Sequence, residues 1–409
     1  MTYIFKGIID TTLRDGQQSP YMFDTRKYRF NLEEKKILIN GLVKLGIDRL
    51  EFFSPAVSRV EKSDFSEIKN YLKTITGKKI TKLAHCRCHP LDTSRAIEAG
   101  FDGLNLYMGA SIYAQKFSHG KNKSGLKHLI STLVKNIRKD NPELYLRFSC
   151  EDAFRTPFAD ICSIYDEIAD KIDAVGMPDT TGVATPESVG ILISKFRKRY
   201  PHLDLECHFH NDRGMSLINS VAAVSAGANY IDASVWGLAE RSGISSVSGL
   251  LLNLYSLNPH YTSRYNLALC YPLNVLLGSI LKAQVPVSEP VSLTNRTHIA
   301  GVHQKAVLNN VKVYEAQNLE KFGVTKNQIL LGPLSGWNTI YYYLKEVEGF
   351  DVTYDQAVAI AREYKDQVDR INVENRPESL LKKIVKNYPL VKYVIPSTYS
   401  GNRVENLAQ

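Results

Sequence analysis

The chain has 409 residues, of which 44% are hydrophobic and 23% charged, a composition typical of an ordinary globular protein. No apolar stretch reaches the roughly 18 residues of a membrane-spanning helix, and no signal peptide is visible, so we expect a cytoplasmic protein without a membrane partner. The formal net charge of +9 comes without long basic runs interleaved with aromatic residues. This argues against nucleic acid and favours a small anionic substrate.

Short β-branched runs alternate with amphipathic windows over the first two thirds of the chain. The expected strands are Gly7–Leu13, Arg49–Phe53, Thr81–Cys86, Gly103–Met108, Tyr145–Cys150, Ala174–Met177, Asp204–Phe209 and Tyr230–Val235. The clearest helical windows are Leu32–Leu45, Lys127–Arg138, Ser188–Tyr200 and Ser216–Ala226. This alternation predicts an α/β fold, a (β/α)₈ TIM barrel, and no Gly-x-Gly-x-x-Gly follows the first strand to favour a dinucleotide-binding sheet.

The pattern changes near residue 275. We expect residues 1–275 to form the barrel and residues 276–409 to form a linker and a small, mostly helical accessory region. The expected elements of that region are an extended linker over 283–295, helices over 336–347 and 354–368, and a short helix with a frayed end from Arg376. The linker assignment depends on two prolines, which disfavour helix.

Two histidines, His208 and His210, stand at positions i and i+2 at the end of a predicted strand, so their side chains share one face. Asp15 follows the first strand, and the carboxyl ends of all barrel strands meet at one rim. Two imidazoles and a carboxylate are a typical ligand set for a divalent metal (Mg, Mn or Zn) that leaves positions open for a chelating 2-oxo acid. An ordinary hydrogen-bonded strand pair is the alternative for the histidines.

Three polar residues on the fifth strand, Arg147, Ser149 and Glu151, are expected to point into the barrel because they are spaced by two. Burying such groups is costly unless they are paired or functional. Arg147 could bind a substrate carboxylate while Glu151 transfers a proton or orients water. An Arg147–Glu151 ion pair that closes the barrel layer is the structural alternative.

Four segments in chain order carry a family resemblance: Asp10–Gln18, His208–Asp212, Glu240–Ile244 and Gly301–His303. With them the chain resembles the metal-dependent Claisen-type TIM-barrel enzymes, which include isopropylmalate, homocitrate and citramalate synthases and hydroxymethylglutaryl-CoA lyase. The resemblance spans residues 4–345. It implies that acetyl-CoA condenses with a metal-bound 2-oxo acid and that CoA is released, which makes the protein an acyltransferase.

Within this family the chain is most similar to the homocitrate synthase branch, through His85 and the run Arg147–Asp152. The resemblance therefore implies 2-oxoglutarate as the oxo acid. It assigns Asp15, His208 and His210 to the metal, Arg14, Gln18, His85, Arg147, Ser149 and Thr180 to the oxo acid, and Arg14, Glu151 and His303 to catalysis. It also implies a homodimer in which the C-terminal region acts in trans, with His303 serving the partner's barrel.

Some residues depart from the family pattern and leave alternatives open. Asn105 stands where homocitrate synthases typically carry an Asp that binds inhibitory lysine, which argues against lysine inhibition. The same chemistry on oxaloacetate, 2-oxoisovalerate or pyruvate stays open, because the changes lie near the substrate mouth. A lyase is less favoured, since residues 237–249 contain no cysteine where lyases usually carry one on a mobile loop.

Overall fold

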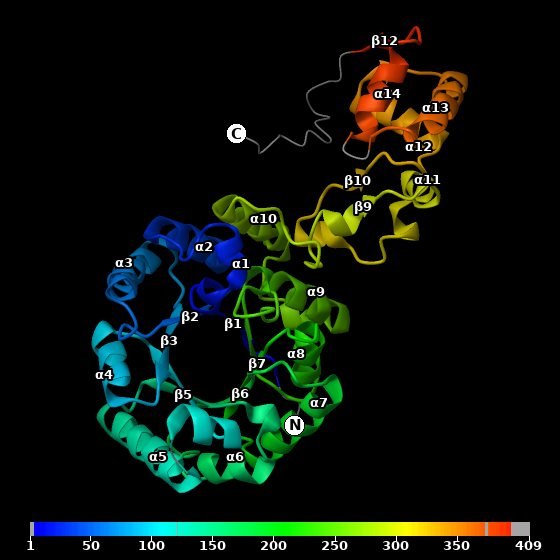
Figure 1. The fold of residues 1–409 in the computed structure, drawn as a ribbon. Helices are drawn as coiled ribbons and strands as arrows, with labels where there is room; N and C mark the ends of the chain where they lie inside the picture. Colours follow the sequence, from blue (N-terminus) through cyan, green and yellow to red (C-terminus); the bar gives the residue numbers. More distant parts are fainter. Residues whose placement is uncertain (1–3, 121, 373–374, 394–409) are drawn as a thin grey trace. The chain divides into compact units, whose positions relative to one another are not determined.

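The computed structural model describes residues 4–120, 122–372 and 375–393. The chain divides into two compact units, residues 1–291, named here the barrel unit, and residues 292–409, named the C-terminal unit. Figure 1 shows the closed ring of strands in the barrel unit with helices around it.

The barrel unit is built on eight parallel strands that pair in chain order and close between the first and the last. This confirms the α/β TIM barrel. The strands are β1 (Gly7–Asp10), β2 (Arg49–Phe53), β3 (Thr81–Arg87), β4 (Gly103–Gly109), β5 (Tyr145–Glu151), β6 (Ala174–Asp179), β7 (Asp204–Phe209) and β8 (Tyr230–Ala233).

Helices connect the strands, and the four expected windows coincide with α2, α5, α7 and α8. The helices of this unit are α1 (Pro20–Asp24), α2 (Leu32–Leu45), α3 (Arg59–Ile75), α4 (Pro90–Ala99), α5 (Lys123–Asp140), α6 (Phe158–Tyr165), α7 (Pro186–Arg199), α8 (Ser216–Ser225), α9 (Val247–Leu257) and α10 (Cys270–Leu281). The bounds of α2 follow from its caps. Asn31 and Glu34 form a capping box, and Gly46 ends the helix at φ +112°.

Two strands are shorter than the sequence predicts. β1 ends at Asp10 instead of Leu13, because the Asp10 carboxylate accepts hydrogen bonds from the Thr12 backbone N–H and hydroxyl and turns the chain. β8 ends at Ala233 instead of Val235, where the Val235 N–H donates to Thr12 Oγ1 instead of continuing the ladder. Both strands therefore end in one shared turn at the barrel rim.

The barrel interior has an apolar layer and a polar layer. Ile9, Leu83 and Tyr230 form a buried apolar cluster against which Tyr145 packs. The next inward positions along the strands carry the polar side chains described below. Alternate residues such as Leu106 and Phe148 point outward and are fully buried beneath the helices. The strand period thus separates an apolar outer core from the barrel interior, in which a polar layer follows the apolar one.

The compact units divide after Val291, whereas the sequence predicts that the linker begins after residue 275. Residue 275 lies inside α10, a helix that packs against α2 and α9 through buried leucines such as Leu273 and Leu277. Asn274 also donates to the Val291 carbonyl at 3.0 Å. The linker that follows α10 therefore starts as part of the barrel unit.

The C-terminal unit is mostly helical, as expected. Its elements are α11 (Gly301–Asn309), α12 (Trp337–Tyr342), α13 (Tyr354–Val368) and α14 (Pro377–Val385), with the strand pairs β9 (Thr297–His298) with β10 (Gln328–Ile329) and β11 (Phe350–Asp351) with β12 (Val391–Lys392). Ile340, Ile360, Tyr364 and Leu381 belong to its core. The frayed end expected beyond the last helix lies largely outside the described residues.

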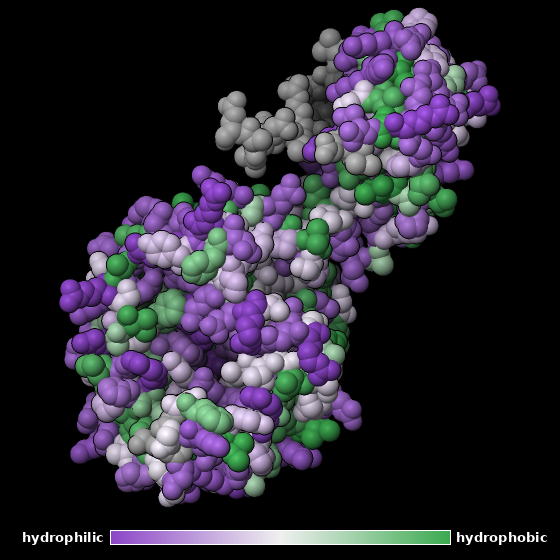
Figure 2. All heavy atoms as spheres, viewed as in Figure 1, coloured by the Kyte–Doolittle hydropathy of each residue, from purple (hydrophilic) through white to green (hydrophobic). Residues whose placement is uncertain are grey.

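The surface of the barrel unit is mixed, with hydrophobic residues scattered singly or in small groups among hydrophilic ones in the view of Figure 2. Within the described part of the chain, no helix is long and apolar enough to cross a membrane. The six cysteines are all buried free thiols.

Candidate active site in the barrel

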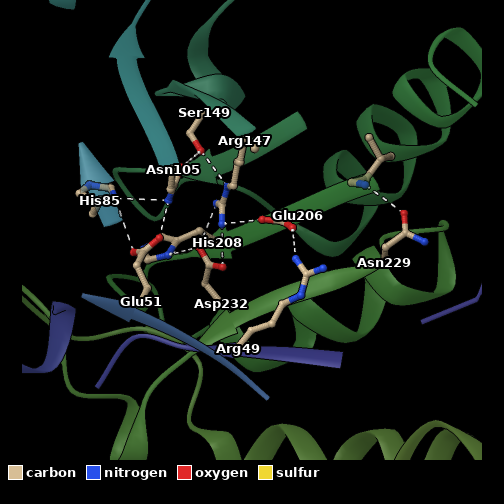
Figure 3. A network of polar contacts seen from close by, with 12 residues as sticks. Arg49, Glu51, His85, Asn105, Arg147, Ser149, Glu206, His208, Asn229 and Asp232 are labelled. Carbon is tan, nitrogen blue, oxygen red and sulfur yellow. Dashed lines mark hydrogen bonds and ion pairs between the residues drawn. The ribbon is translucent and has the colours of Figure 1, made fainter. Parts of the chain in front are cut away.

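Arg147 on β5 is the centre of a buried polar network in the barrel interior (Figure 3). Its Nη1 and Nη2 each donate at 2.9 Å to one carboxylate oxygen of Asp232 on β8. Its Nε donates to Ser149 Oγ at 3.0 Å, and Nη1 lies 3.1 Å from Glu206 Oε2 on β7. The partners of Arg147 are thus Asp232 and Glu206, which corrects the alternative of an Arg147–Glu151 pair.

A glycine on the neighbouring strand makes room for this arginine. A Cβ placed on Gly176 of β6 would lie 1.9 Å from Ser149 Oγ and 2.8 Å from Arg147 Nε. Any other residue at this position would displace both side chains. The sequence of β6 is therefore part of what positions Arg147.

Glu206 joins the network to residues nearer the start of the strands. Its Oε1 accepts a hydrogen bond from the Tyr145 hydroxyl at 2.6 Å and lies 3.3 Å from Arg49 Nη1. Burial raises the pKa of Glu206, while Arg147 and Arg49 act in the opposite direction. Burial likewise favours the neutral form of Asp232, but Arg147 holds the pKa of that carboxyl below its usual range.

A second arginine, Arg14, occupies the other side of the barrel interior. Its Nε donates to Glu51 Oε1 at 2.9 Å, and Nη2 lies 3.2 Å from His85 Nδ1. Burial alone would raise the pKa of Glu51, but Arg14 and His85 hold it well below its usual range. Burial and Arg14 lower the pKa of His85, which favours a neutral imidazole.

Asn105 on β4 links the two arginine clusters. Its Nδ2 donates to Glu51 Oε2 at 2.6 Å, and its Oδ1 accepts from Ser149 Oγ at 2.8 Å. An aspartate here would place a carboxylate against Glu51 in place of a donor. The amide at position 105 is thus matched to its buried partners.

The three expected metal ligands lie together at the rim. His208 Nε2 is 3.4 Å from His210 Nε2, and His208 Nδ1 is 3.9 Å from Asp15 Oδ2. His208 Nδ1 also lies 3.2 Å from Asp232 Oδ2. The other carboxylate oxygen of Asp15 accepts a hydrogen bond from Arg14 Nη1.

Two imidazoles and a carboxylate are side chains that bind divalent cations, and two of these residues have an atom that no hydrogen bond among the described residues uses. Asp15 Oδ2 and His210 Nδ1 are buried and make no hydrogen bond to the described residues. Burial lowers the pKa of His210 to about 3, which keeps the imidazole in the neutral, ligating form. Among the described residues, no three acidic, His or Cys side chains are arranged around a common point so that they could hold a metal ion.

The other expected site residues of the barrel unit are placed unequally. Glu151 ends β5 and is half-buried, and burial raises its pKa while Arg14 opposes that shift. Thr180 follows β6, and its hydroxyl accepts from the Asp152 N–H at 2.8 Å. Gln18 is exposed, whereas its neighbour Gln17 is buried and donates to the Leu13 carbonyl. Gln18 therefore stands apart from the buried network.

His303 lies in the C-terminal unit on α11 and is exposed. Its ring packs on Tyr314 with a centroid separation of 3.9 Å. Nearby, Glu315 binds Arg296 Nε at 2.7 Å and lies 3.3 Å from His298 Nε2. His298 is thus held in an ion-pair cluster within the unit, whereas His303 is accessible.

The sequence predictions missed three acidic residues of the network: Glu51, Glu206 and Asp232. Each is fully buried on a barrel strand. A usable signal was present, because each stands at an inward strand position between outward apolar residues. An unpaired carboxylate is rarely placed there, so such a residue predicts a buried cation nearby.

Comparisons with known proteins agree with this architecture. Residues 6–273 match the family described as HMGL-like, and residues 291–372 match the homocitrate synthase post-HMGL domain-like family. A solved hydroxymethylglutaryl-CoA lyase from Pseudomonas aeruginosa shares the fold, with a TM-score of 0.55 at 18% identity over 70% of this chain and 95% of that one. The chain belongs to the HMGL-like family, in the branch of acyltransferases that also carries the homocitrate synthase post-HMGL domain.

Curated relatives in that branch cover both units. The chain is 36% identical over 338 residues to the mitochondrial homocitrate synthase of Schizosaccharomyces pombe, covering 82% of this chain and 77% of the relative. It is 32% identical over 387 residues to the cytosolic homocitrate synthase isozyme of Saccharomyces cerevisiae, covering 93% and 86%. Because relatives occur in both compartments, the cytoplasmic location stays a prediction.

Proposed function

We propose that this enzyme condenses acetyl-CoA with a 2-oxo acid, 2-oxoglutarate, to give homocitrate and free CoA. The observation that carries the proposal is the similarity to homocitrate synthases over both units. The barrel interior supports a dicarboxylic oxo acid, because two arginines and His85 surround its polar layer. A branched monoacid such as 2-oxoisovalerate would leave these donors facing an apolar side chain.

We assign Asp15, His208 and His210 to a divalent metal, on the grounds of their proximity and of the unpaired atoms of Asp15 and His210. These residues would leave positions at which the carboxylate and ketone oxygens of the oxo acid could chelate the metal, which would supply polarisation of the ketone. Ligands of these types are compatible with Mg, Mn or Zn.

Arg14 and Glu151 have complementary roles in the proposed reaction. Arg14 holds a positive charge beside the rim, where it stabilises negative charge on the reacting oxygen. Glu151 has a raised pKa, so its carboxylate is a better base for the acetyl methyl proton than an exposed glutamate. The methyl carbon then attacks C2 of the oxo acid, and hydrolysis of the thioester releases CoA.

We further propose that the enzyme is a homodimer in which His303 of one subunit serves the barrel of the other. His303 is exposed on α11, where its ring stacks on Tyr314, so its imidazole is accessible to a second surface. It would transfer protons together with Glu151. Gln18, His85, Arg147, Ser149 and Thr180 are assigned to the oxo acid.

The decisive experiment is a thiol-release assay with acetyl-CoA and four oxo acids: 2-oxoglutarate, oxaloacetate, 2-oxoisovalerate and pyruvate. We expect the highest kcat/KM with 2-oxoglutarate, and homocitrate as the product by mass spectrometry. A preference for one of the other three would keep the chemistry and overturn the substrate. Cleavage of a hydroxyacyl-CoA without any condensation would identify a lyase instead. Added lysine is expected to leave the rate unchanged, since position 105 is an amide.

A further inference from the structure

One carboxylate, Asp232, touches both halves of the site. Its two oxygens accept from Nη1 and Nη2 of Arg147 at 2.9 Å each. The same Oδ2 that binds Nη2 lies 3.2 Å from His208 Nδ1. Asp232 is only 1% exposed, so water does not replace either contact. Figure 3 shows this carboxylate between the arginine and the histidine.

The contact with His208 decides which imidazole nitrogen is available. A carboxylate accepts, so the proton on the His208 ring is on Nδ1, and Nε2 keeps its lone pair. Nε2 is the nitrogen that faces His210, at 3.4 Å. An acidic partner on the far nitrogen is how metal-binding histidines are commonly oriented.

The contact with Arg147 limits how that guanidinium moves. Both Nη atoms are on Asp232, Nε is on Ser149, and Nη1 also faces Glu206. Three of the five N–H groups of an arginine are thereby hydrogen-bonded, while Glu206 Oε2 lies 3.1 Å from Nη1 without accepting a hydrogen bond. Arg147 is therefore held in one orientation and keeps one N–H on each Nη for a ligand.

We propose that Asp232 is a positioning residue that holds Arg147 and His208 together, so that the oxo-acid carboxylate and the metal keep one fixed spacing. This inference rests on the proposed function for the roles of Arg147 and His208. It adds that the two subsites are not independent, because one buried carboxylate sets both. An amide at this position carries no charge and must turn its NH2 group toward a donor of Arg147, so it cannot hold both partners as the carboxylate does.

The test is Asp232→Asn in the full chain, freed of metal and titrated with Mn²⁺ by calorimetry. We expect Mn²⁺ to bind about 10- to 100-fold more weakly than to the parent protein. Calorimetric titration with 2-oxoglutarate in saturating Mn²⁺ should also show weaker binding, while KM for acetyl-CoA stays unchanged. Unchanged Mn²⁺ affinity in a folded variant would overturn the proposal.

Glu206→Gln is the matched control, because Glu206 contacts Arg147 and, among the described residues, neither hydrogen-bonds nor ion-pairs with His208. It should weaken 2-oxoglutarate binding and leave Mn²⁺ affinity within about twofold, since Glu206 orients none of the metal-binding side chains. If both variants behave alike, Asp232 serves Arg147 alone and the proposal fails. A parent protein that binds Mn²⁺ but turns over no oxo acid would fail the proposed function and not this inference.

A second measurement covers the case in which Asp232→Asn does not fold. Nitrogen-15 NMR of the metal-free parent protein, labelled at histidine and assigned with His208→Gln, reports the tautomer of His208 directly. We expect the proton on Nδ1, facing Asp232. A proton on Nε2 would contradict the anchoring contact without any change at Asp232.

Discussion

The charged groups on the floor of the barrel and those at its rim differ in how completely they are paired. On the floor, defined as Arg49, Tyr145, Arg147, Glu206 and Asp232, every charged group faces an opposite charge within 3.3 Å, and even Glu206 Oε2, which accepts no hydrogen bond from the described residues, lies 3.1 Å from Arg147 Nη1. The rim, defined as Asp15, Glu151 and His210, contains buried atoms that lack any hydrogen-bond partner among the described residues.

This difference separates two uses of buried polarity. Pairing on the floor offsets the desolvation of its charges and fixes the geometry of the strands around it. At the rim, buried atoms of Asp15 and His210 make no hydrogen bond to the described residues, which costs stability unless a ligand binds them. Changes on the floor should therefore lower the stability of the fold as well as ligand binding, whereas changes on the rim should act mainly on activity.

The largest effect is expected from Asp15→Asn at the rim. Weakened metal binding should reduce turnover on the order of 10⁴-fold, several kcal/mol of barrier. The free energy of unfolding in urea should fall less than in Arg147→Met, because the amide oxygen can still accept from Arg14 Nη1 and Asp15 Oδ2 has no hydrogen bond to lose. Asp24→Asn, an exposed carboxylate on α1, is the control and should change neither quantity. Normal turnover in Asp15→Asn would refute the metal assignment.

The next largest effect is expected on the floor, from Arg147→Met. Removing this guanidinium leaves Asp232 without its two charge-assisted bonds and should lower the free energy of unfolding by about 3–5 kcal/mol. Arg199→Met, which breaks a half-exposed pair with Asp166, should cost less than about 1 kcal/mol. Equal losses in the two variants would show that the buried ion pairs of the floor contribute no more to stability than a half-exposed pair does.

A smaller effect is expected at Asp10, a buried carboxyl that has no cation beside it. Burial raises the pKa of Asp10 to about 7, although hydrogen bonds from Thr12 oppose the shift. Between about pH 4 and pH 7 the unfolded chain has released this proton while the folded chain keeps it, so stability falls as the pH rises.

Asp10→Asn removes that dependence. At pH 8 the variant should be more stable than the parent protein, by an amount on the order of 2 kcal/mol, and the gap should close near pH 4. Urea unfolding at both pH values measures it. A gap of equal size at both pH values would mean that Asp10 titrates normally in the folded state.

The smallest effect concerns the C-terminal unit, and it extends the comparison beyond the barrel. Mixing inactive His303→Ala and His208→Ala subunits should restore about a quarter of parental activity, because half of randomly mixed dimers would carry one complete site out of two. Thiol release after subunit exchange, with the mixed dimer verified by mass, measures the recovery. No recovery in verified mixed dimers would place His303 in the site of its own subunit.

Much of the fold could be predicted from local patterns. The β-branched runs and amphipathic windows located all eight strands and four helices of the barrel, because strand and helix periods are local properties. The strand ends were less accurate. At β1 a hydrogen bond from Thr12 to the Asp10 carboxylate replaced the ladder, and at β8 one from the Val235 N–H to Thr12 Oγ1 did so; such contacts carry no periodic signal.

The candidate site was predicted unevenly for a related reason. Asp15, His208 and His210 were recognisable because each follows a strand in a distinctive motif. Glu51, Glu206 and Asp232 were missed because a single acid within an apolar strand has no motif. Arg147 was expected to be free for a substrate, and the structure places it against Asp232, 85 residues away.

The sequence alone thus determined the family, the order of the strands and which side chains reach the rim, since these follow from local period and motif. Only the tertiary structure decided which charge faces which. β5 and β8 are not neighbours in the sheet, and Arg147 meets Asp232 only because the barrel closes and aims inward residues at a common interior. Closure is a long-range property, so the pairing that joins the oxo-acid and metal subsites could not be read from either strand by itself.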